Sequence, residues 1–432
     1  ESKNLSARAR DTAGTFKELA ASIREVSSMA LSQNGCTPWF EQAFMGAMEN
    51  SAALSAPEDL ERSLGGGGGE TKQAATSDEV TWLQAFSNLG AVLFSVDTKG
   101  YETLVKLQKS GKYESLVTAP LLNVIPPYRI SRGKVSTGDS WGLDAIQARS
   151  LWKKGITGKG IVVGHLGGWV DGKHPALKGA VQGGAAVEID ERGRPKKSVP
   201  DGYDAHATHT AGTIAGRSSK DQTIGVAPEA TLCCLVATEP GNRMARILGG
   251  LDEAVKRGAR VIFFPFANPD YHGDFALLLS RLRELSVLPV VPIGNDGPET
   301  SDSPANGPRV LSSGASTRKK EVAGFSSSQA FIVPENRQVP SLVAPGEGVV
   351  SCVPGGSFAA MAGTTMAAAH VTGLVALLFS AFPEAAPADV ETAILDSCTR
   401  LGSMPVARAN RGIPNAPRAL SHLETIMARK RS

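Results

Sequence analysis

Residues 363–371 read GTTMAAAHV and introduce the stretch that decides the fold. Gly363 starts a turn, and the small residues after it lead into an apolar helix expected over Ala367–Phe382. A hydroxyl at the start of a helix lies where free N–H groups and the positive end of the helix dipole favour a developing anion. The alternative is that Thr364 or Thr365 only caps the helix. By itself the motif is compatible with either role.

Two further segments supply polar side chains that suit a hydrolytic site. Residues 206–214 read HATHTAGTI and place His206 at the start of another small-residue helix. Residues 290–297 read VVPIGNDG, a buried strand that ends at Asn295 on a glycine turn. A lone His or Asn would be structural in most proteins. Together, a histidine base, an amide donor and a hydroxyl indicate nucleophilic catalysis with an oxyanion hole.

Around these motifs, residues 141–427 alternate apolar strands with helices. Arg246–Arg257 is a predicted helix between strands, and it adds to the helix after Gly363. The predicted strands are Gly160–Leu166, Ala230–Val236, Arg260–Phe264, Val287–Ile293 and Val310–Ala315. Alternation of β and α predicts an α/β domain with a doubly wound, mostly parallel sheet and helices on both faces.

The chain before residue 141 is expected to contain four parts. Residues 1–64 are predicted to form a helical module, with one amphipathic stretch over Trp39–Met48. Residues 65–77 begin with five glycines and form a flexible linker. Residues 78–128 read as a small α+β segment, and the polar residues 129–140 as a second linker. In the α+β segment we expect helices over Val80–Leu89 and Tyr101–Lys109 and strands over Ala91–Val96, Ser115–Val117 and Leu122–Ile125.

Composition excludes several classes of protein. The 432 residues carry a net charge of +3 and are 41% hydrophobic, so nothing favours nucleic acid or an anionic membrane as a partner. The five cysteines form no metal or redox pattern, which is typical of a reducing compartment. No signal pattern is seen at Glu1 and no apolar run reaches about 18 residues, so we expect a cytoplasmic protein. A leader removed before Glu1 stays an open alternative.

The three motifs resemble the catalytic segments of the subtilisin-like serine proteases, whose triad follows the order Asp, His, Ser. The similarity covers residues 141–425 and includes several other landmarks of that family. These are WGLDAI (141–146), GKGIVV (158–163), HPALKG (174–179), GVAP (225–228) and VAPG (343–346). Residues 78–128 are similar to the family's inhibitory prodomain, although its first strand is not evident. The resemblance implies a peptidase fold that needs no cofactor.

Two departures from the family pattern concern the triad itself. Counting back from the His-Pro pair at residue 174 puts Gly167 at the position of the acid, and Thr365 replaces the serine. The resemblance leaves His206 as the base and Asn295 as the oxyanion donor. In a subtilisin, losing the acid lowers turnover about 10⁴-fold or more, and losing the nucleophile or base about 10⁶-fold. The methyl group of Thr365 also crowds the site that a scissile carbonyl must enter.

A third departure lies in the expected peptide-binding edge. The family's Ser-Leu-Gly is replaced by Phe264-Pro265-Phe266, and a proline there has no N–H to donate to a substrate strand. The segment 218–225 also lacks the longer loop that builds a calcium site in many relatives, so we expect no metal there.

The sequence leaves three hypotheses open. In the first, the chain is an inactive pseudoprotease that acts by binding or regulation. It would recruit a protein or peptide partner through residues 1–64 and hold its own prodomain-like segment in the cleft. In the second, it is a weak endopeptidase that uses Thr365 and His206. In the third, a serine was deliberately replaced, which explains Thr365 but not the changed turn at Gly167-Gly168-Trp169.

Overall fold

A computed structural model places most of the chain in two compact units, described one at a time. The residues described are 43–46, 80–96, 98–111, 115–119, 122–131, 140–218, 222–269, 271–273, 275–331, 337–401 and 404–431. The glycine linker at 65–77 and the helical stretches expected near the N-terminus lie outside them, apart from residues 43–46.

The first unit contains a four-stranded antiparallel sheet with strand order β2-β3-β1-β4. Its elements are β1 (Ala43–Gly46), β2 (Val80–Phe86), β3 (Ala91–Val96), α3 (Thr98–Lys109) and β4 (Ser115–Thr118). A small core forms where Leu104 of α3 packs with Phe94 and its neighbours on β3. The predicted strands over 91–96 and 115–117 and the helix over 101–109 are therefore confirmed.

Two predictions for this unit are wrong. Val80–Leu89 was expected to be a helix, but Val80–Phe86 is a strand, because its β-branched and aromatic residues pair with β3. Residues 43–46, expected within a helix, form strand β1 between β3 and β4. The sheet therefore includes strands from both sides of the glycine run in the sequence.

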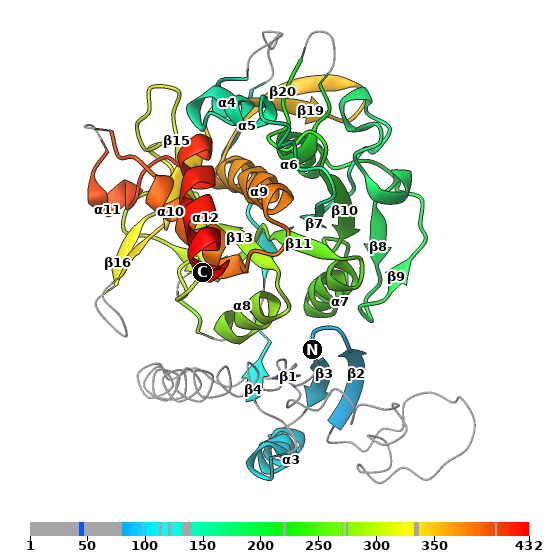
Figure 1. Cartoon of the computed structure of the whole chain (residues 1–432). Helices are drawn as coiled ribbons and strands as arrows, with labels where there is room; N and C mark the ends of the chain where they lie inside the picture. The colour runs from blue at the N-terminus through cyan, green and yellow to red at the C-terminus, as the bar shows by residue number, and fades with distance from the viewer. Residues whose placement is uncertain are drawn as a thin grey trace. The chain divides into compact units, whose positions relative to one another are not determined.

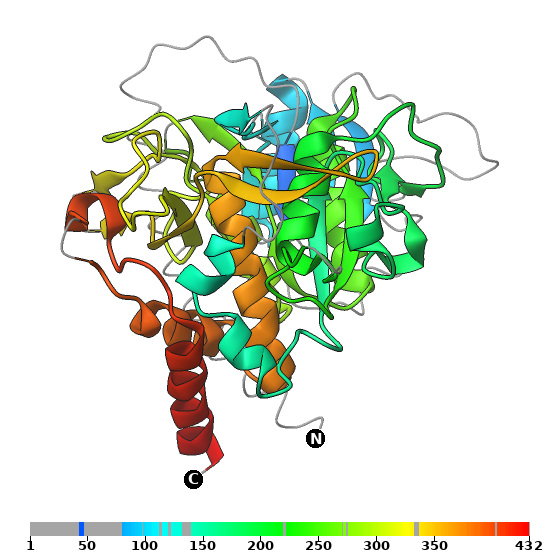
Figure 2. The same ribbon diagram turned by 90° about the horizontal axis from the view of Figure 1, so that it is seen from above.

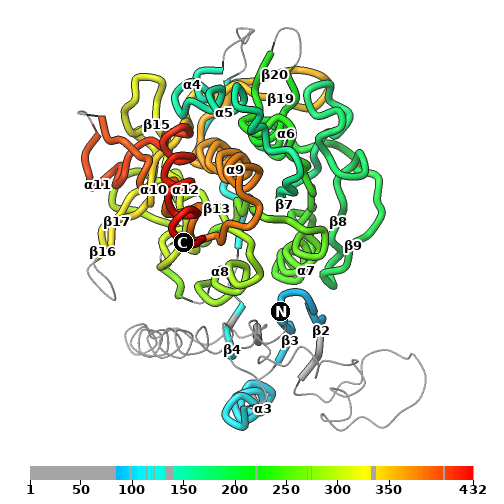
Figure 3. The backbone as a smooth tube through the Cα atoms, viewed as in Figure 1, coloured from blue at the N-terminus to red at the C-terminus, as the bar shows by residue number. Residues whose placement is uncertain are grey.

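The second unit is built on an eight-stranded sheet with order β18-β15-β13-β11-β7-β10-β8-β9. The neighbours from β18 to β8 are parallel, and only β9 is antiparallel. The strands are β7 (Val162–Gly167), β8 (Val187–Ile189), β9 (Pro195–Lys196), β10 (Thr231–Val236), β11 (Ala259–Phe263), β13 (Leu288–Pro292), β15 (Leu311–Ser316) and β18 (Leu342–Pro345). This is the subtilisin-like α/β architecture expected from the sequence, and its chain path can be followed in Figure 3.

The helices lie on both faces of this sheet. α7 (Arg243–Lys256) and α8 (Phe275–Glu284) contact it on one face, and α6 (Ala205–Ala215) and α9 (Thr364–Ala381) on the other (Figure 1). α10 (Pro387–Ser397) and α12 (Ala416–Arg431) pack on each other and on α9. The short helices are α4 (Trp141–Ala145), α5 (Arg149–Trp152) and α11 (Val406–Ala409).

Short strands complete the unit at the carboxyl ends of the central strands. β5 (Asn123–Val124), β12 (Phe266–Pro269) and β14 (Asp302–Ser303) form one small sheet, and β6 (Arg129–Ser131), β19 (Val349–Val353) and β20 (Ser357–Ala362) form another. β16 (Gln329–Phe331) and β17 (Arg337–Val339) form a hairpin. The presence of β6 corrects the prediction that 129–140 begins as a linker, because residues 129–131 pair with β20.

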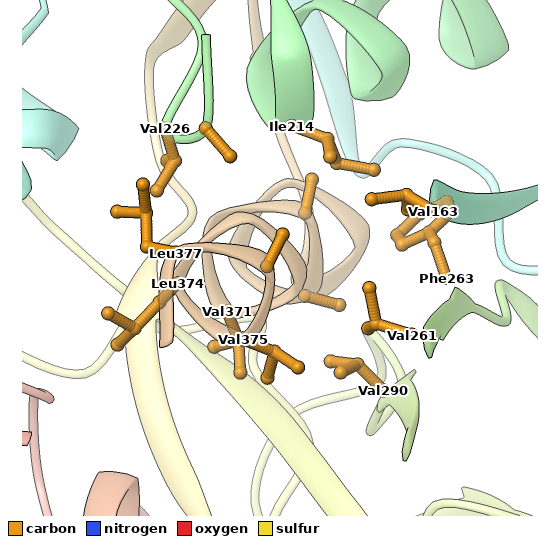
Figure 4. Close-up of a cluster of buried hydrophobic side chains, with 14 of the residues drawn as sticks. Val163, Ile214, Val226, Val261, Phe263, Val290, Val371, Leu374, Val375 and Leu377 are labelled. Atoms are coloured by element: carbon orange, nitrogen blue, oxygen red, sulfur yellow. The ribbon is translucent and has the colours of Figure 1, made fainter. Parts of the chain in front are cut away.

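Helix α9 forms the centre of the core. Val371 and Val375 share one buried cluster with Val261 and Val290 of the sheet, and all four are labelled in Figure 4. The small residues Ala367, Ala368 and Ala369 in the first turns of the helix are fully buried. α9 is also long and apolar enough to cross a membrane by composition, although no such run was expected. Because 89% of it is buried inside the unit, its burial is that of a core helix. In Figure 2, α9 is seen from the side, in orange, and α12 lies to its left, in red.

Candidate functional site

The site lies at the carboxyl ends of β7, β11 and β13, where the strand order changes direction. β8, β9 and β10, which follow β7 in the chain, lie on one side of it, and β11 to β18 follow in order on the other side. A crevice at such a switch point is the usual ligand position in open α/β sheets. The predicted site residues all belong to segments that meet here: Gly167 ends β7, His206 begins α6, Asn295 follows β13 and Thr365 begins α9.

The hydroxyl and the imidazole are in hydrogen-bonding contact. His206 Nε2 lies 2.9 Å from Thr365 Oγ1. Thr365 is fully buried in the first turn of α9, and Gly363 makes the sharp entry to that helix. A base within hydrogen-bond reach of a hydroxyl is the arrangement that nucleophilic catalysis needs.

Asn295 joins this pair to the rest of the site. Its Oδ1 accepts hydrogen bonds from the backbone N–H of Thr364 at 2.9 Å and from the Thr364 hydroxyl at 3.1 Å. These bonds hold the start of α9 and orient the amide, so that Nδ2 points away and donates to the carbonyl oxygen of Pro126 at 2.9 Å. Asn295 therefore already holds a peptide carbonyl, as an oxyanion donor would.

Gly167, the position at which the resemblance predicts the triad acid, ends β7 and carries no side chain. A side chain at Gly167 would meet His165 Cε1 at 3.6 Å and Ala207 Cβ at 3.7 Å, which are ordinary contacts. Among the described residues, no carboxylate oxygen makes a hydrogen bond to the ring of His206. The side chain nearest to Gly167 is that of His165. Its Nε2 lies 2.9 Å from the Thr210 hydroxyl, and its Nδ1 is buried without a hydrogen-bond partner.

Asp204 is a site residue that the sequence reasoning missed. It is the N-cap of α6, and its Oδ1 accepts a hydrogen bond from Ala207 N at 3.0 Å. Its own N–H donates to the carbonyl of Trp169 at 2.7 Å, which ties the start of α6 to the turn after β7. An Asp directly before a small-residue helix is a readable N-cap signal, and it could have been found.

Burial keeps the histidines of the site neutral. It lowers the pKa of His206 from 6.5 to about 4, although the negative charge of Asp204 acts in the opposite direction. Burial also lowers the pKa of His165 and of His209 to about 3, and the charge of His206 adds to both effects. A neutral imidazole is the form that can accept a proton from a hydroxyl.

Residues 122–131 run through the site as an extended segment. Asn123 and Val124 pair antiparallel with Ala267 and Phe266 of β12, and Ile125 N donates to Pro265 O at 2.9 Å. Beyond the carbonyl held by Asn295, Tyr128 stacks on Phe325 with ring centroids 4.4 Å apart. β6 then pairs with β20, next to the start of α9.

The backbone around Pro265, at the expected peptide-binding edge, pairs with β5. Pro265 lacks an N–H but its carbonyl still accepts a hydrogen bond, and the ladder continues at Phe266. The rings of Phe264 and Phe266 are fully buried and pack edge to face, 5.6 Å apart, so the backbone makes the contacts of this edge. Strand pairing therefore persists despite the proline.

The Arg217 side chain, just after α6, links three backbone carbonyl groups. The Arg217 guanidinium donates to the carbonyl oxygens of Pro228, Ala230 and Gly179. Its backbone N–H also donates to Ala176 O.

Within the described residues, no cluster of three or more His, Cys, Asp or Glu side chains could hold a metal ion.

Comparison with known proteins agrees with this fold. Residues 158–414 match the subtilase family of peptidases. The chain is 32% identical over 247 residues to a major intracellular serine protease of Bacillus subtilis, covering 55% of this chain and 74% of that protein. It is 31% identical to an intracellular serine protease of Paenibacillus polymyxa, covering 59% and 77%.

A solved structure shows the same fold. Fervidolysin from Fervidobacterium pennivorans, a keratinolytic enzyme related to subtilisin, superposes with a TM-score of 0.65 at 23% identity, covering 88% of this chain and 61% of that one. An α/β sheet with a hydroxyl, a histidine and an asparagine at its switch point defines a subtilisin-like protein. With the sequence matches, the chain belongs to the subtilase family.

Proposed function

We propose that this subtilase has lost peptide-bond hydrolysis and binds extended peptide segments instead, beginning with its own residues 122–131. The observation that carries the proposal is Gly167 at the acid position, with no carboxylate bonded to the His206 ring among the described residues. Without that acid, nothing fixes the imidazole tautomer or takes up part of the charge that forms on proton transfer.

The contacts of residues 122–131 support the binding role. The segment is held on one side by β12, in the middle by the amide of Asn295, and on the other side by β20. These are backbone contacts, which give affinity for an extended chain with little dependence on its side chains. We propose that this prodomain-like end stays docked and that a protein or peptide partner competes for the same edge.

The alternative function is weak endopeptidase activity. The 2.9 Å contact between His206 Nε2 and Thr365 Oγ1 and the position of the Asn295 amide favour it. Under this alternative, the chain would share the serine protease activity named for its two intracellular relatives. We also propose a cytoplasmic location, which the same two relatives support.

Hydrolysis of casein and of a fluorogenic peptide by the purified full chain decides between the two functions. We expect a rate equal to that of the His206→Ala variant. Removing the base from a triad that already lacks its acid should cause little further loss of activity. Mass spectrometry of the same sample should find one intact chain. A rate clearly above that of His206→Ala, or cleavage near residues 128–140, would establish the endopeptidase.

A further inference from the structure

Asp204 lies against the turn that replaces the triad acid. A Cβ atom at Gly168 would overlap Asp204 Oδ2 and lie 2.9 Å from its Cγ. The carboxyl group therefore occupies the space that a side chain at 168 would need, one residue after the acid position. Gly167 has no such restriction, since a methyl group there would make only ordinary contacts. Glycine at 168, unlike glycine at 167, is required by the place of this carboxylate.

Both oxygens of Asp204 are close to the start of α6. Oδ1 caps the N–H of Ala207, the residue after His206. Oδ2 faces the Gly168 backbone, and no described residue donates a hydrogen bond to it. The side chain thus lies between the strand end that lost its acid and the turn that carries the imidazole.

We propose that Asp204 is the counter-charge of His206, so that the negative charge once borne by the strand end comes from the N-cap of α6, across Gly168. Asp204 acts on His206 as a positioning residue and does not touch a reacting atom. The inference concerns the charge of His206 alone, and it holds whether or not the chain hydrolyses peptides.

The surroundings of His206 leave Asp204 as its principal charged neighbour. β7 contributes His165 and the second turn of α6 contributes His209, both kept neutral by burial. α9 contributes the uncharged Thr365 hydroxyl. The Asp204 carboxylate is the group that opposes the effect of burial on the His206 pKa.

This arrangement provides only one of the two effects that a triad acid has on its histidine. A carboxylate bonded to Nδ1 both fixes the tautomer and stabilises the imidazolium. Asp204 supplies negative charge without a hydrogen bond to the ring, so it contributes to the second effect only. The chain therefore retains part of the electrostatics of a working site.

The test is ¹⁵N NMR of histidine-labelled full chain, with the His206 signal assigned from its loss in His206→Gln. With a pKa of about 4, about a tenth of His206 is protonated at pH 5. We expect Asp204→Asn to lower that fraction about threefold or more. Asparagine keeps the cap, as Asn242 does for α7. If Asp204→Asn does not fold, Asp204→Ser caps the helix equally without charge.

Two matched controls separate charge from structure. Asp201→Asn removes the same charge from an exposed position three residues earlier and should leave the fraction unchanged. Gly168→Ala should displace the carboxylate and change the fraction without any change of charge, whereas Gly167→Ala should not. A wild-type protonated fraction in folded Asp204→Asn, or an equal decrease in Asp201→Asn, would overturn the proposal.

Discussion

The two sides of the site have diverged to different degrees. On the side of β13 and α9, Asn295 fixes the N-terminus of α9 and holds a peptide carbonyl, and Thr365 meets His206 at 2.9 Å. On the side of β7, Gly167 and Gly168 stand where the resemblance predicts an acid and its neighbour. The contacts that hold the start of α9 are therefore independent of the residues that end β7.

The largest expected effect comes from repairing the changed side. A Cβ atom at residue 167 would make only ordinary contacts, so Gly167→Asp combined with Thr365→Ser should rebuild the triad. We expect hydrolysis of a fluorogenic peptide to rise at least about 10³-fold over the unmodified chain. Rates are measured at increasing peptide concentration, since residues 122–131 compete for the same edge.

The control for this repair is His206→Ala in the repaired chain, which should abolish the gain. If the folded, repaired chain stays inactive at every peptide concentration, then the β13 and α9 side is not competent either, and the comparison between the two sides fails.

The next effect is a loss of stability in acid. Burial lowers the pKa of His165 and His209 to about 3 and that of His206 and His370 to about 4, from 6.5. Below pH 6.5 the unfolded chain binds protons at these residues and the folded chain does not. The contribution of these neutral histidines to the free energy of unfolding is therefore fully present above that pH. It decreases as the pH falls toward 4, by about 1.4 kcal/mol per pH unit for each histidine.

Urea unfolding at pH 7.5 and 5.5 measures this loss, which should total about 5 kcal/mol for the four histidines. His165→Gln should reduce the difference by about a quarter. Equal unfolding free energies at the two pH values would mean that the histidines are not buried in neutral form.

A smaller effect tests the retained side. Asn295→Ala leaves the buried Thr364 N–H without an acceptor and frees the carbonyl of Pro126. The free energy of unfolding should fall by about 1–3 kcal/mol, the cost of an unsatisfied buried group. Limited proteolysis should then cut residues 122–131 more readily.

Asp296→Ala is the control, because its side chain is exposed on the same turn, and its cost should stay within about 0.5 kcal/mol. Similar losses in the two variants would show that Asn295 does not hold the segment.

Much of the second unit could be predicted from sequence because local signals there agree with the final fold. Apolar runs bounded by glycines became β7, β10, β11, β13 and β15 within a few residues. The joint presence of His206, Asn295 and Thr365 placed three segments at one site, since parallel strands end at the same edge.

The misses share a physical cause, which is pairing between residues far apart in the chain. Residues 129–131 are polar and read as a linker, yet β20 supplies the partner that makes them a strand. β1 depends on β3 and β4 across the glycine run. Asp204 was missed for another reason: its cap was readable, but its place against Gly168 depends on how α6 meets β7.

The Arg217 guanidinium gives the loop after α6 a fixed positive centre that belongs to the polypeptide. Three carbonyl oxygens converge on it, as they could on a dissolved cation. A charge held by a side chain cannot dissociate or be stripped by a chelator, and its occupancy does not vary with the ionic composition of the surroundings. The link that Arg217 makes between residues 179, 228 and 230 is therefore independent of the ion concentration, unlike a link made by a bound ion.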